Sequence, residues 1–193
     1  GVTLEVEPGV KIEIAPESIG EYIEYNPAIY VNGGQLLVDG SRDKRVTLDA
    51  LSGIFVKDGI SMNGRAIVKY ADFINGSRIW FENSFGEVSS STITGTYMGI
   101  GMKDSMVKVT ASNISGNEQG IYIEAHRSFP VGFGDDNIFG MGGFGNAFAY
   151  APELHASSSL IIRDSDLSGN SVKSEFNASD FTVDAKNNWW GSS

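Results

Sequence analysis

The sequence predicts an all-β protein built from a short repeat that stacks on itself. The pair Asn113-Ile114 has counterparts at Asp72-Phe73, Thr92-Ile93, Asp166-Leu167 and Asn188-Trp189. Consecutive copies are separated by 20, 21, 53 and 22 residues, so three of the four spacings are nearly equal. Each copy joins a short apolar strand to a polar corner and a glycine. A fixed period of this length is typical of stacked-repeat proteins.

Composition agrees with this fold class and excludes several kinds of partner. A length of 193 residues fits a single domain, residues 1–193, and 24 glycines allow frequent corners. The net charge of −10 argues against binding to nucleic acid or to anionic membrane surfaces. No apolar run approaches the length of a membrane span. Because the chain opens at Gly1 within a strand pattern, we expect a processed or excised piece of a longer protein.

The absence of cysteine removes a further set of functions. With no Cys in the sequence, disulfides, thiolate metal sites and cysteine nucleophiles are all excluded. The acidic charge is typical of secreted domains that bind calcium or that use the charge for solubility alone, and solubility is the commoner reason.

The first strands are predicted from alternation of apolar and polar residues. This alternation runs over residues 2–6 and 10–14, with Pro8-Gly9 as the corner between them. Residues 15–28 break the pattern with two prolines and form an excursion. Alternation then resumes over 29–31, 36–38 and 46–48, and we interpret these three strands with their corners as one coil of a solenoid.

Further coils follow the same plan. They are predicted from the segments 54–56, 60–62 and 66–73; 79–81, 86–89 and 91–93; and 100–102, 107–109 and 113–114. A new coil opens at 121–123, but the period is interrupted over about 126–157. It returns in register at 160–162, so we interpret the interruption as a loop inserted at one corner. No segment carries a helical stripe of three turns, and helix content should be minimal.

Stacking explains why such short units are stable. One coil buries too little apolar surface alone, whereas neighbouring coils complete the core and pair their strands in parallel. Equivalent residues then lie ~4.8 Å apart, which predicts a polar ladder of the five register residues Asp72, Thr92, Asn113, Asp166 and Asn188. In each corner, Gly76, Gly95, Gly116 and Gly169 would adopt positive φ.

Several motifs together resemble a known superfold. They are the terminal DAKNNWWGSS, the repeats SNISGN and SDLSGN, and the opening LEVEPGVKIEI followed by VNGGQLLVDGS. They look like the right-handed parallel β-helix proteins of the pectate-lyase-like superfold, of the secreted or cell-surface type. The resemblance implies about seven coils. It is weak for function, because that superfold includes lyases, hydrolases, adhesins and scaffolds.

The resemblance can be tested against the catalytic members of the superfold. Asp135-Asp136 is the one Asp-Asp pair, but it lies in the insertion; there is no Gly-His-Gly, and Arg163 is followed by Asp164 rather than by the second half of an Arg-x-Lys element. His126 and His155 bracket the insertion, where with Asp135, Asp136 and Glu153 they could form a metal or acid–base site. Irregularly spaced loop histidines are more often incidental, so these are weak catalytic candidates. The metal content is unknown, with calcium possible.

The insertion is the segment that departs most from the repeat. It carries more large apolar groups than a free loop in water would hold, and these are Phe129, Phe133, Phe139, Phe144, Phe148 and Tyr150. Sugar rings stack on aromatic faces, which favours a carbohydrate-binding loop. The alternative is a flap that covers an apolar flank. Trp189-Trp190 invites the same interpretation, but its register favours a structural role, one ring filling the last coil and the other covering its side.

We therefore expect an extracellular or cell-surface scaffold or adhesion domain without enzymatic activity, which binds polysaccharide or cell-surface glycan through the aromatic, glycine-rich loop. A polysaccharide lyase or glycoside hydrolase is the alternative. A self-assembling filament or sheath subunit is a third possibility, because open strand edges at the ends of a β-helix can pair with another copy.

Overall fold

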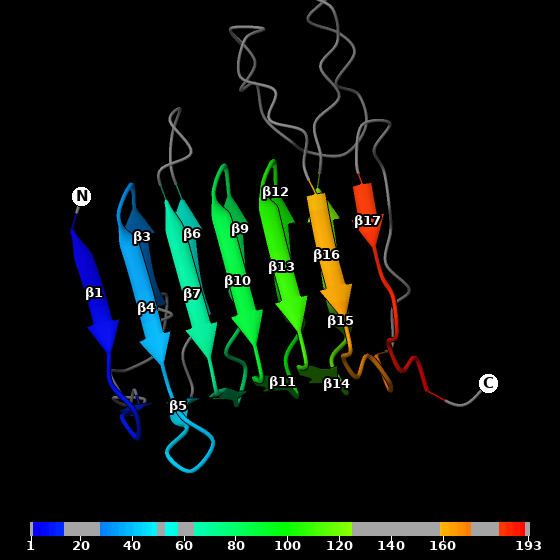
Figure 1. Cartoon of the computed structure of the whole chain (residues 1–193), viewed down its shortest axis with the longest axis horizontal. Helices are drawn as coiled ribbons and strands as arrows, with labels where there is room; N and C mark the ends of the chain where they lie inside the picture. The colour runs from blue at the N-terminus through cyan, green and yellow to red at the C-terminus, as the bar shows by residue number, and fades with distance from the viewer. Residues whose placement is uncertain are drawn as a thin grey trace, which may run out of the picture.

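The computed structural model describes residues 2–13, 28–49, 53–57, 64–124, 159–170 and 182–191. These residues form seventeen strands and no helix, and every strand pair is parallel. The strands belong to three sheets, which we call sheets A, B and C (Figure 1). The predicted all-β class and the near absence of helix are confirmed for this part of the chain.

Sheet A is the largest of the three and lies in front in Figure 1. Its strands in spatial order are β1 (Thr3–Val6), β4 (Gln35–Asp39), β7 (Arg65–Lys69), β10 (Phe85–Ser89), β13 (Met106–Thr110), β16 (Ser159–Arg163) and β17 (Thr182–Asp184).

The two other sheets have five strands each. Sheet B contains β2 (Lys11–Glu13), β5 (Val46–Asp49), β8 (Ala71–Ile74), β11 (Thr92–Thr94) and β14 (Asn113–Ser115). Sheet C contains β3 (Ala28–Asn32), β6 (Gly53–Lys57), β9 (Ile79–Glu82), β12 (Met98–Lys103) and β15 (Gln119–Glu124).

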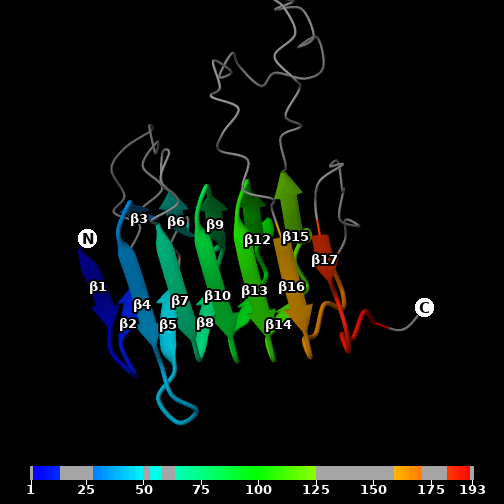
Figure 2. The same ribbon diagram turned by 45° about the horizontal axis from the view of Figure 1, so that its top comes forward.

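The chain visits sheets C, A and B in turn, for example through β3, β4 and β5 and then through β6, β7 and β8. Each round advances one position in all three sheets, so the first strands lie at one end of the molecule and the last at the other (Figure 2). The three-strand unit predicted from residues 29–48 is confirmed. This arrangement is consistent with a parallel β-helix, a solenoid in which each coil pairs only with its neighbours.

The core lies between the three sheets and is made of aligned rows of apolar side chains. In sheet B the row Leu48, Phe73, Ile93, Ile114 is fully buried, and each residue is the register partner of the next. Ile121 and Ile123 of β15 are also buried, so the core extends to the last strand of sheet C. A large side chain of one sheet is packed against a small residue of another. A Cβ on Gly86 of β10 would lie only 2.4 Å from the Phe81 ring of β9, because that ring fills the space beside the glycine.

The corners after three consecutive sheet A strands, β10, β13 and β16, are each closed by a buried serine. The residue before that serine has positive φ without being glycine, as at Ser90 (49°) and Ala111 (49°). The backbone N–H of Ser91 donates to Ser112 Oγ, and that of Ser112 donates to Ser165 Oγ at 3.1 Å. Each of these hydroxyls in turn donates to the carbonyl two residues earlier. The result is a continuous serine ladder that satisfies backbone groups inside the corner.

The corners after β8, β11 and β14, and the equivalent corner after the bridge residue Asp166, use glycine followed by a polar residue. Gly76, Gly95, Gly116 and Gly169 all have positive φ, as predicted. The residue that follows is turned inward: Asn117 Oδ1 accepts from the Thr96 backbone, and Asn170 Oδ1 accepts from the Asn117 backbone, both at 3.0 Å. The solenoid therefore has polar ladders at two of its three corners, and the pair Ser84 and Ser105 provides the equivalent contact at the third.

The predicted ladder of register residues is correct for four of its five members. Asp72, Thr92, Asn113 and Asp166 are successive partners. They are only partly buried, however, so they line the outer side of sheet B, while the corner is filled by the serines. The fifth member was wrong by one residue, because Trp189 and not Asn188 pairs with Asp166. Asn188 instead ends the serine ladder, since its Oδ1 accepts from the Ser165 backbone at 3.0 Å.

Candidate functional site

All site residues predicted from the sequence lie outside the described residues. They are the weak catalytic candidates His126, Asp135, Asp136 and His155, and the aromatic residues Phe129, Phe133, Phe139, Phe144, Phe148 and Tyr150. The same holds for the insertion at 126–157 in which they lie. What the structure defines is its point of attachment, because β15 ends at Glu124 and β16 begins at Ser159. These two strands belong to sheets C and A.

The most distinctive outer surface of the described part is a row of aromatic side chains on sheet C, which we call the aromatic row. Its register positions are occupied in order by Tyr30, Phe55, Trp80, Gly101 and Tyr122. Inward-facing apolar residues alternate with them along each strand, so the row faces away from the core. It crosses five consecutive strands and therefore runs along the long axis of the solenoid.

The rings of the aromatic row stack on one another. Tyr30 and Phe55 have ring centroids 5.3 Å apart with an interplanar angle of 19°. On the side of Phe55 towards β9, the guanidinium of Arg78 lies 5.3 Å from the ring centroid. This is a cation–π contact, and it continues the stack from Tyr30 through Phe55 to Arg78.

A glycine lets the second pair of rings meet. Trp80 and Tyr122 stack with their centroids 6.1 Å apart, although β12 separates their strands. A Cβ on Gly101 of β12 would lie 2.2 Å from Trp80 Cε3, so the indole leans over the glycine. The side chain that Gly101 lacks is therefore replaced by the neighbouring indole, and the aromatic surface continues to β15.

A row of polar residues, charged at every position except the first, flanks the aromatic row on the same sheet, and we call it the charged row. Its positions are Asn32, Lys57, Glu82 and Lys103, with Glu124 next in register. Lys57 Nζ lies 2.9 Å from a Glu82 carboxylate oxygen, and Lys103 Nζ lies 3.8 Å from the other.

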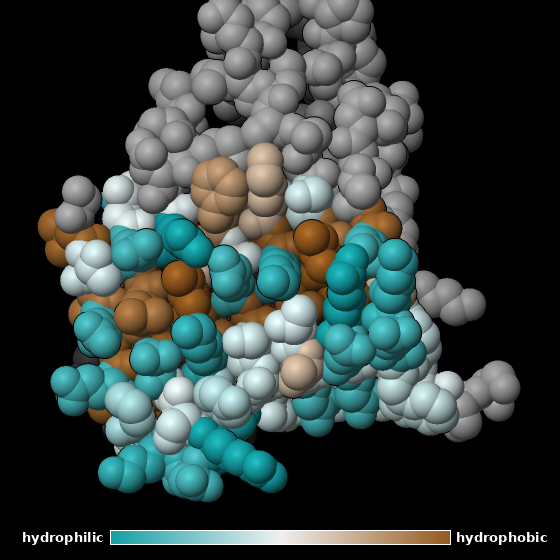
Figure 3. Space-filling model, viewed as in Figure 1, coloured by the Kyte–Doolittle hydropathy of each residue, from teal (hydrophilic) through white to brown (hydrophobic). Residues whose placement is uncertain are grey.

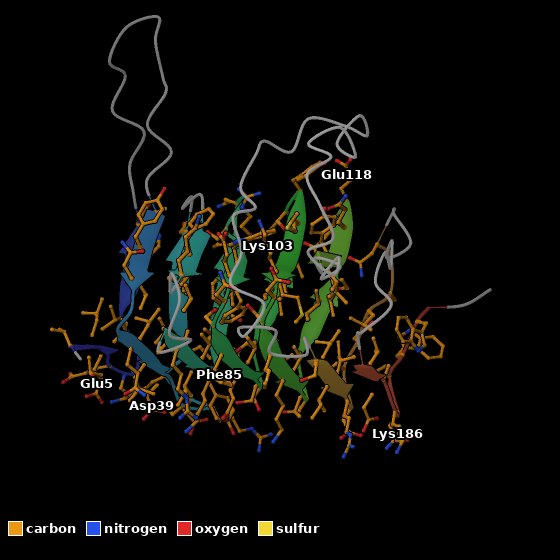
Figure 4. The ribbon with its side chains drawn as sticks, turned by 90° about the horizontal axis from the view of Figure 1, so that it is seen from above. Glu5, Asp39, Phe85, Lys103, Glu118 and Lys186 are labelled. Atoms are coloured by element: carbon orange, nitrogen blue, oxygen red, sulfur yellow. The ribbon has the colours of Figure 1, made fainter. Side chains whose placement is uncertain are left out.

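Figure 4 places Lys103 and Glu118 on the side of the molecule opposite Glu5, Asp39, Phe85 and Lys186.

The electrostatics of this charged row favour an ionised Glu82. Burial of the Glu82 carboxyl group disfavours its charged form. This effect is outweighed by the hydrogen bond and charge of Lys57, by the charge of Lys103 and by a hydrogen bond with the Trp80 side chain. The pKa of Glu82 is therefore lowered from its ordinary value. A carboxyl group held in its ionised form is a poor general acid, so this row is better suited to binding than to proton donation.

The other carboxyl groups with displaced pKa values have the same character. Hydrogen bonds from Asn75 and Lys11 lower the pKa of Asp49, and the ion pair with Arg163 lowers that of Asp184. Asp72, at the centre of sheet B, is held by Arg45, whose Nε lies 2.9 Å from both carboxylate oxygens. Arg45 also donates to the carbonyls of Ala71 and Ser90, so the pair links neighbouring coils.

The two C-terminal tryptophans correct a prediction. Trp189 and Trp190 are 59% and 60% exposed, so neither ring fills the core of the last coil. Trp189 occupies the outer row of sheet B, paired with Asp166. For Trp189 the prediction failed because it aligned Asn188 rather than Trp189 with the repeat, which reverses the direction assigned to the Trp189 side chain. The exposure of Trp190 is not explained by this shift.

The outer face of sheet A offers a different surface. Figure 3 shows apolar area over these strands interspersed with polar side chains. Register places Leu37 beside Ile67 and Phe85 beside Met106, and the Arg65–Glu87 ion pair (2.9 Å) lies among them. This face is mixed in character and has no continuous row of one chemical kind.

Two classes of site are not found among the residues that the structure describes. No group of three or more His, Asp or Glu side chains there is placed to hold a metal ion. No helix in this part is long and apolar enough to cross a membrane. The first result leaves calcium binding by the remaining segments as a prediction.

The aromatic row was not predicted from the sequence, although a signal was present. Tyr30, Phe55 and Trp80 each sit between two apolar residues that point inward. Their spacing of 25 residues differs from the 20 to 22 of the register pairs, because the corners between these early coils are longer. The row becomes visible only once sheet C is aligned by its own register.

Comparison with known proteins identifies no relative. No protein-family model, no curated protein and no solved structure matches the chain.

Proposed function

We propose that the chain is a non-enzymatic, extracellular or cell-surface domain with the right-handed parallel β-helix fold of the pectate-lyase-like superfold, which serves as a rigid scaffold and binds polysaccharide. We propose that the repeat forms about seven coils. Right-handed winding is supported by Figure 1, where sheet A strands in front run downward and sheet C strands behind run upward as the chain proceeds to the right.

The observation that carries the scaffold proposal is the use made of the repeated polar residues. Ser112, Asn117 and Arg45 all bond groups in neighbouring coils rather than facing solvent as a cluster. Ladders of this kind stiffen a solenoid, because each one links coils that otherwise contact only their immediate neighbours. Residues committed in this way are not available to bind and transform a substrate.

The aromatic row supports the binding part of the proposal. It is apolar, runs along the solenoid axis with one position per strand, and is flanked by Lys57 and Glu82, which suits an extended polymer of repeating units. Within each stacked pair the rings cover one another, so a sugar would meet ring edges and the outer face of Tyr30, which is 63% exposed. Contacts of this kind favour weak, multivalent retention.

The predicted aromatic loop remains part of the proposed binding surface. β15 carries Tyr122, the last member of the aromatic row, and leads directly into the segment that contains Phe133, Phe139 and Phe144. Loop and row are thus adjacent along the chain.

Retention of the purified protein on insoluble polysaccharides, and its retardation in gels that contain soluble ones, tests this proposal. Tyr30→Ala and the triple variant Phe133→Ala/Phe139→Ala/Phe144→Ala should each reduce retention. Tyr97→Ala is the matched control, because Tyr97 is 58% exposed but lies outside the aromatic row. Unchanged retention in both variants would rule out the proposed surface, and unsaturated products or new reducing ends from uronate polymers would rule out a non-enzymatic role.

A filament or sheath subunit is the second candidate, and one observation favours it. Nine large apolar residues are exposed in the described part. Seven of them lie on or next to the first three strands, or on or after the last strand, and they are Val2, Leu4, Val10, Tyr30, Val183, Trp189 and Trp190. Apolar side chains beside unpaired strand edges favour end-to-end pairing of copies. Sedimentation velocity at rising concentration should then show growing species, which Trp189→Ser/Trp190→Ser would abolish. A monomer at all concentrations would contradict this candidate.

A further inference from the structure

The corner after β8 differs from its equivalents in one chemical respect. The glycine of this corner is preceded by Asn75, whereas Gly95, Gly116 and Gly169 are preceded by Thr or Ser. An asparagine followed by glycine can cyclise, because the backbone nitrogen of the glycine can attack the side-chain amide. The structure shows whether that nitrogen is available.

The backbone of the Asn75-Gly76 corner is exposed and makes few hydrogen bonds, whereas the Asn75 side chain donates to Asp49 Oδ1 at 2.6 Å. Both residues have positive φ, 55° and 98°, both are exposed, and nothing lies within 4 Å of the position that a Cβ on Gly76 would take. The turn is closed by a long hydrogen bond of 3.4 Å from the Ser77 backbone to the Ile74 carbonyl. No hydrogen bond of the Gly76 backbone N–H is found among the described residues. Its nitrogen is therefore free to approach the Asn75 side chain.

The sequence has two other Asn-Gly pairs, Asn32-Gly33 and Asn63-Gly64. Asn63 lies outside the described residues, and Asn32-Gly33 provides the contrast. Asn32 is also exposed, but it ends strand β3 in register with Lys57. The backbone N–H of Gly33 donates to the Lys57 carbonyl at 3.0 Å. Attack by that nitrogen would require loss of this inter-coil hydrogen bond, which should slow the reaction at Asn32 in the folded protein.

We infer that Asn75 is a site of spontaneous deamidation in the folded protein. The Gly76 nitrogen attacks Asn75 Cγ and forms a C–N bond, and the side-chain nitrogen leaves as ammonia, taking up the proton that the Gly76 nitrogen loses. Water then opens the resulting five-membered imide at either carbonyl. The products are aspartate and isoaspartate, and no oxidant or reductant is needed.

The reaction would change contacts between two coils. Asn75 Nδ2 donates to Asp49 Oδ1 at 2.6 Å, and Lys11 Nζ lies 3.2 Å from the other oxygen of Asp49. Deamidation replaces the donor by a second carboxylate facing Asp49, so a hydrogen bond between β5 and the β8 corner becomes a repulsion. The isoaspartate product also lengthens the backbone at a corner that leads into buried Ser77.

The experiment is incubation of the folded protein at mildly alkaline pH, followed by ion exchange and mass analysis of tryptic peptides. Trypsin releases residues 70–78, in which Asn75 is the one amide side chain. We expect an acidic species that differs by one charge, with aspartate or isoaspartate at position 75 and intact Asn32. The third Asn-Gly pair, Asn63-Gly64, is followed separately in the tryptic peptide of residues 58–65. Asn75→Gln should abolish deamidation in the peptide of residues 70–78, and unfolding in urea should make Asn32, Asn63 and Asn75 all react.

Two results would overturn the inference. One is deamidation of Asn32 as fast as that of Asn75 in the folded protein, which would mean that the Gly33 hydrogen bond gives no protection. The other is an unchanged Asn75 in the folded protein under conditions where the urea-unfolded chain reacts. A matched Asn75→Asp variant supplies the chromatographic reference for the aged form.

Discussion

Trp80 and Tyr122 stack on each other across an intervening strand because that strand carries Gly101. The variant Gly101→Ala should destabilise the protein by about 1–3 kcal/mol, since its Cβ would occupy the space of the indole ring. Urea unfolding measures the change, and tryptophan fluorescence should report the displaced ring. In a Trp80→Val background the same substitution should cost much less; equal costs in both backgrounds would show that the contact does not limit position 101.

The serine ladder should be energetically important at each rung. Ser112→Ala leaves the Ser91 backbone N–H without its acceptor in a buried corner, which should cost about 1–3 kcal/mol in unfolding free energy. Ser115→Ala is the control, because Ser115 is partly exposed and its hydroxyl contacts only the Asn113 side chain. If the two variants were equally stable, the ladder would contribute little to the fold.

Two of the arginine–carboxylate pairs, Arg45–Asp72 and Arg65–Glu87, should differ strongly in their contribution to stability. Arg45 bonds Asp72 and two backbone carbonyls with 30% of its side chain exposed, so Arg45→Ala should cost about 2 kcal/mol. Arg65 pairs with Glu87 at a more exposed site, and Arg65→Ala should cost under about 1 kcal/mol. Thermal unfolding of both variants at two salt concentrations checks the order, and the reverse order would contradict it.

Stability should fall in acid because several carboxyl groups are held ionised. The folded-state pKa values of Glu82, Asp49 and Asp184 are lowered from the ordinary values of these carboxyl groups, 4.5, 3.8 and 3.8. The contribution of these groups to stability is fully present above the ordinary values and is lost as pH falls through the lower folded-state pKa values. Unfolding free energy measured between neutral pH and pH 3 should therefore decrease, and Glu82→Gln should make that decrease smaller. A variant with the same slope as the native chain would show that Glu82 is not coupled to folding.

The sequence was sufficient to predict the strands and the sheet B row but not the surface that the strands present. Ile93 and Ile114 could be aligned because the glycine after each of them recurs at nearly the same distance. A serine precedes three of the register pairs, at Ser91, Ser112 and Ser165. Its side chain points inward because the residue before it has a left-handed backbone conformation, which the sequence does not reveal. At Asn188 the serine is replaced, and the alignment slipped by one residue.

The aromatic row could not be predicted for a different physical reason. Which residues belong to the aromatic row depends on the register of sheet C. That register is fixed by hydrogen bonds between coils and not by a constant number of residues from one coil to the next. Gly101 also interrupts the row in the sequence, while in space the Trp80 ring fills the gap. The candidate residues in the insertion remain predictions.

The stacked register across the insertion is the central claim, and a pair of engineered cysteines tests it most directly. Lys108 of β13 and Ile161 of β16 are outward-facing partners although 53 residues separate them, and the native chain contains no cysteine. Neighbouring strands lie ~4.8 Å apart, which brings such a pair within reach of a disulfide. Lys108→Cys/Ile161→Cys should form an intramolecular disulfide on mild oxidation, while Lys108→Cys/Arg163→Cys, displaced by two residues, should not. Cross-linking of the displaced pair in preference to the aligned pair would contradict the register and the stacking of coils that depends on it.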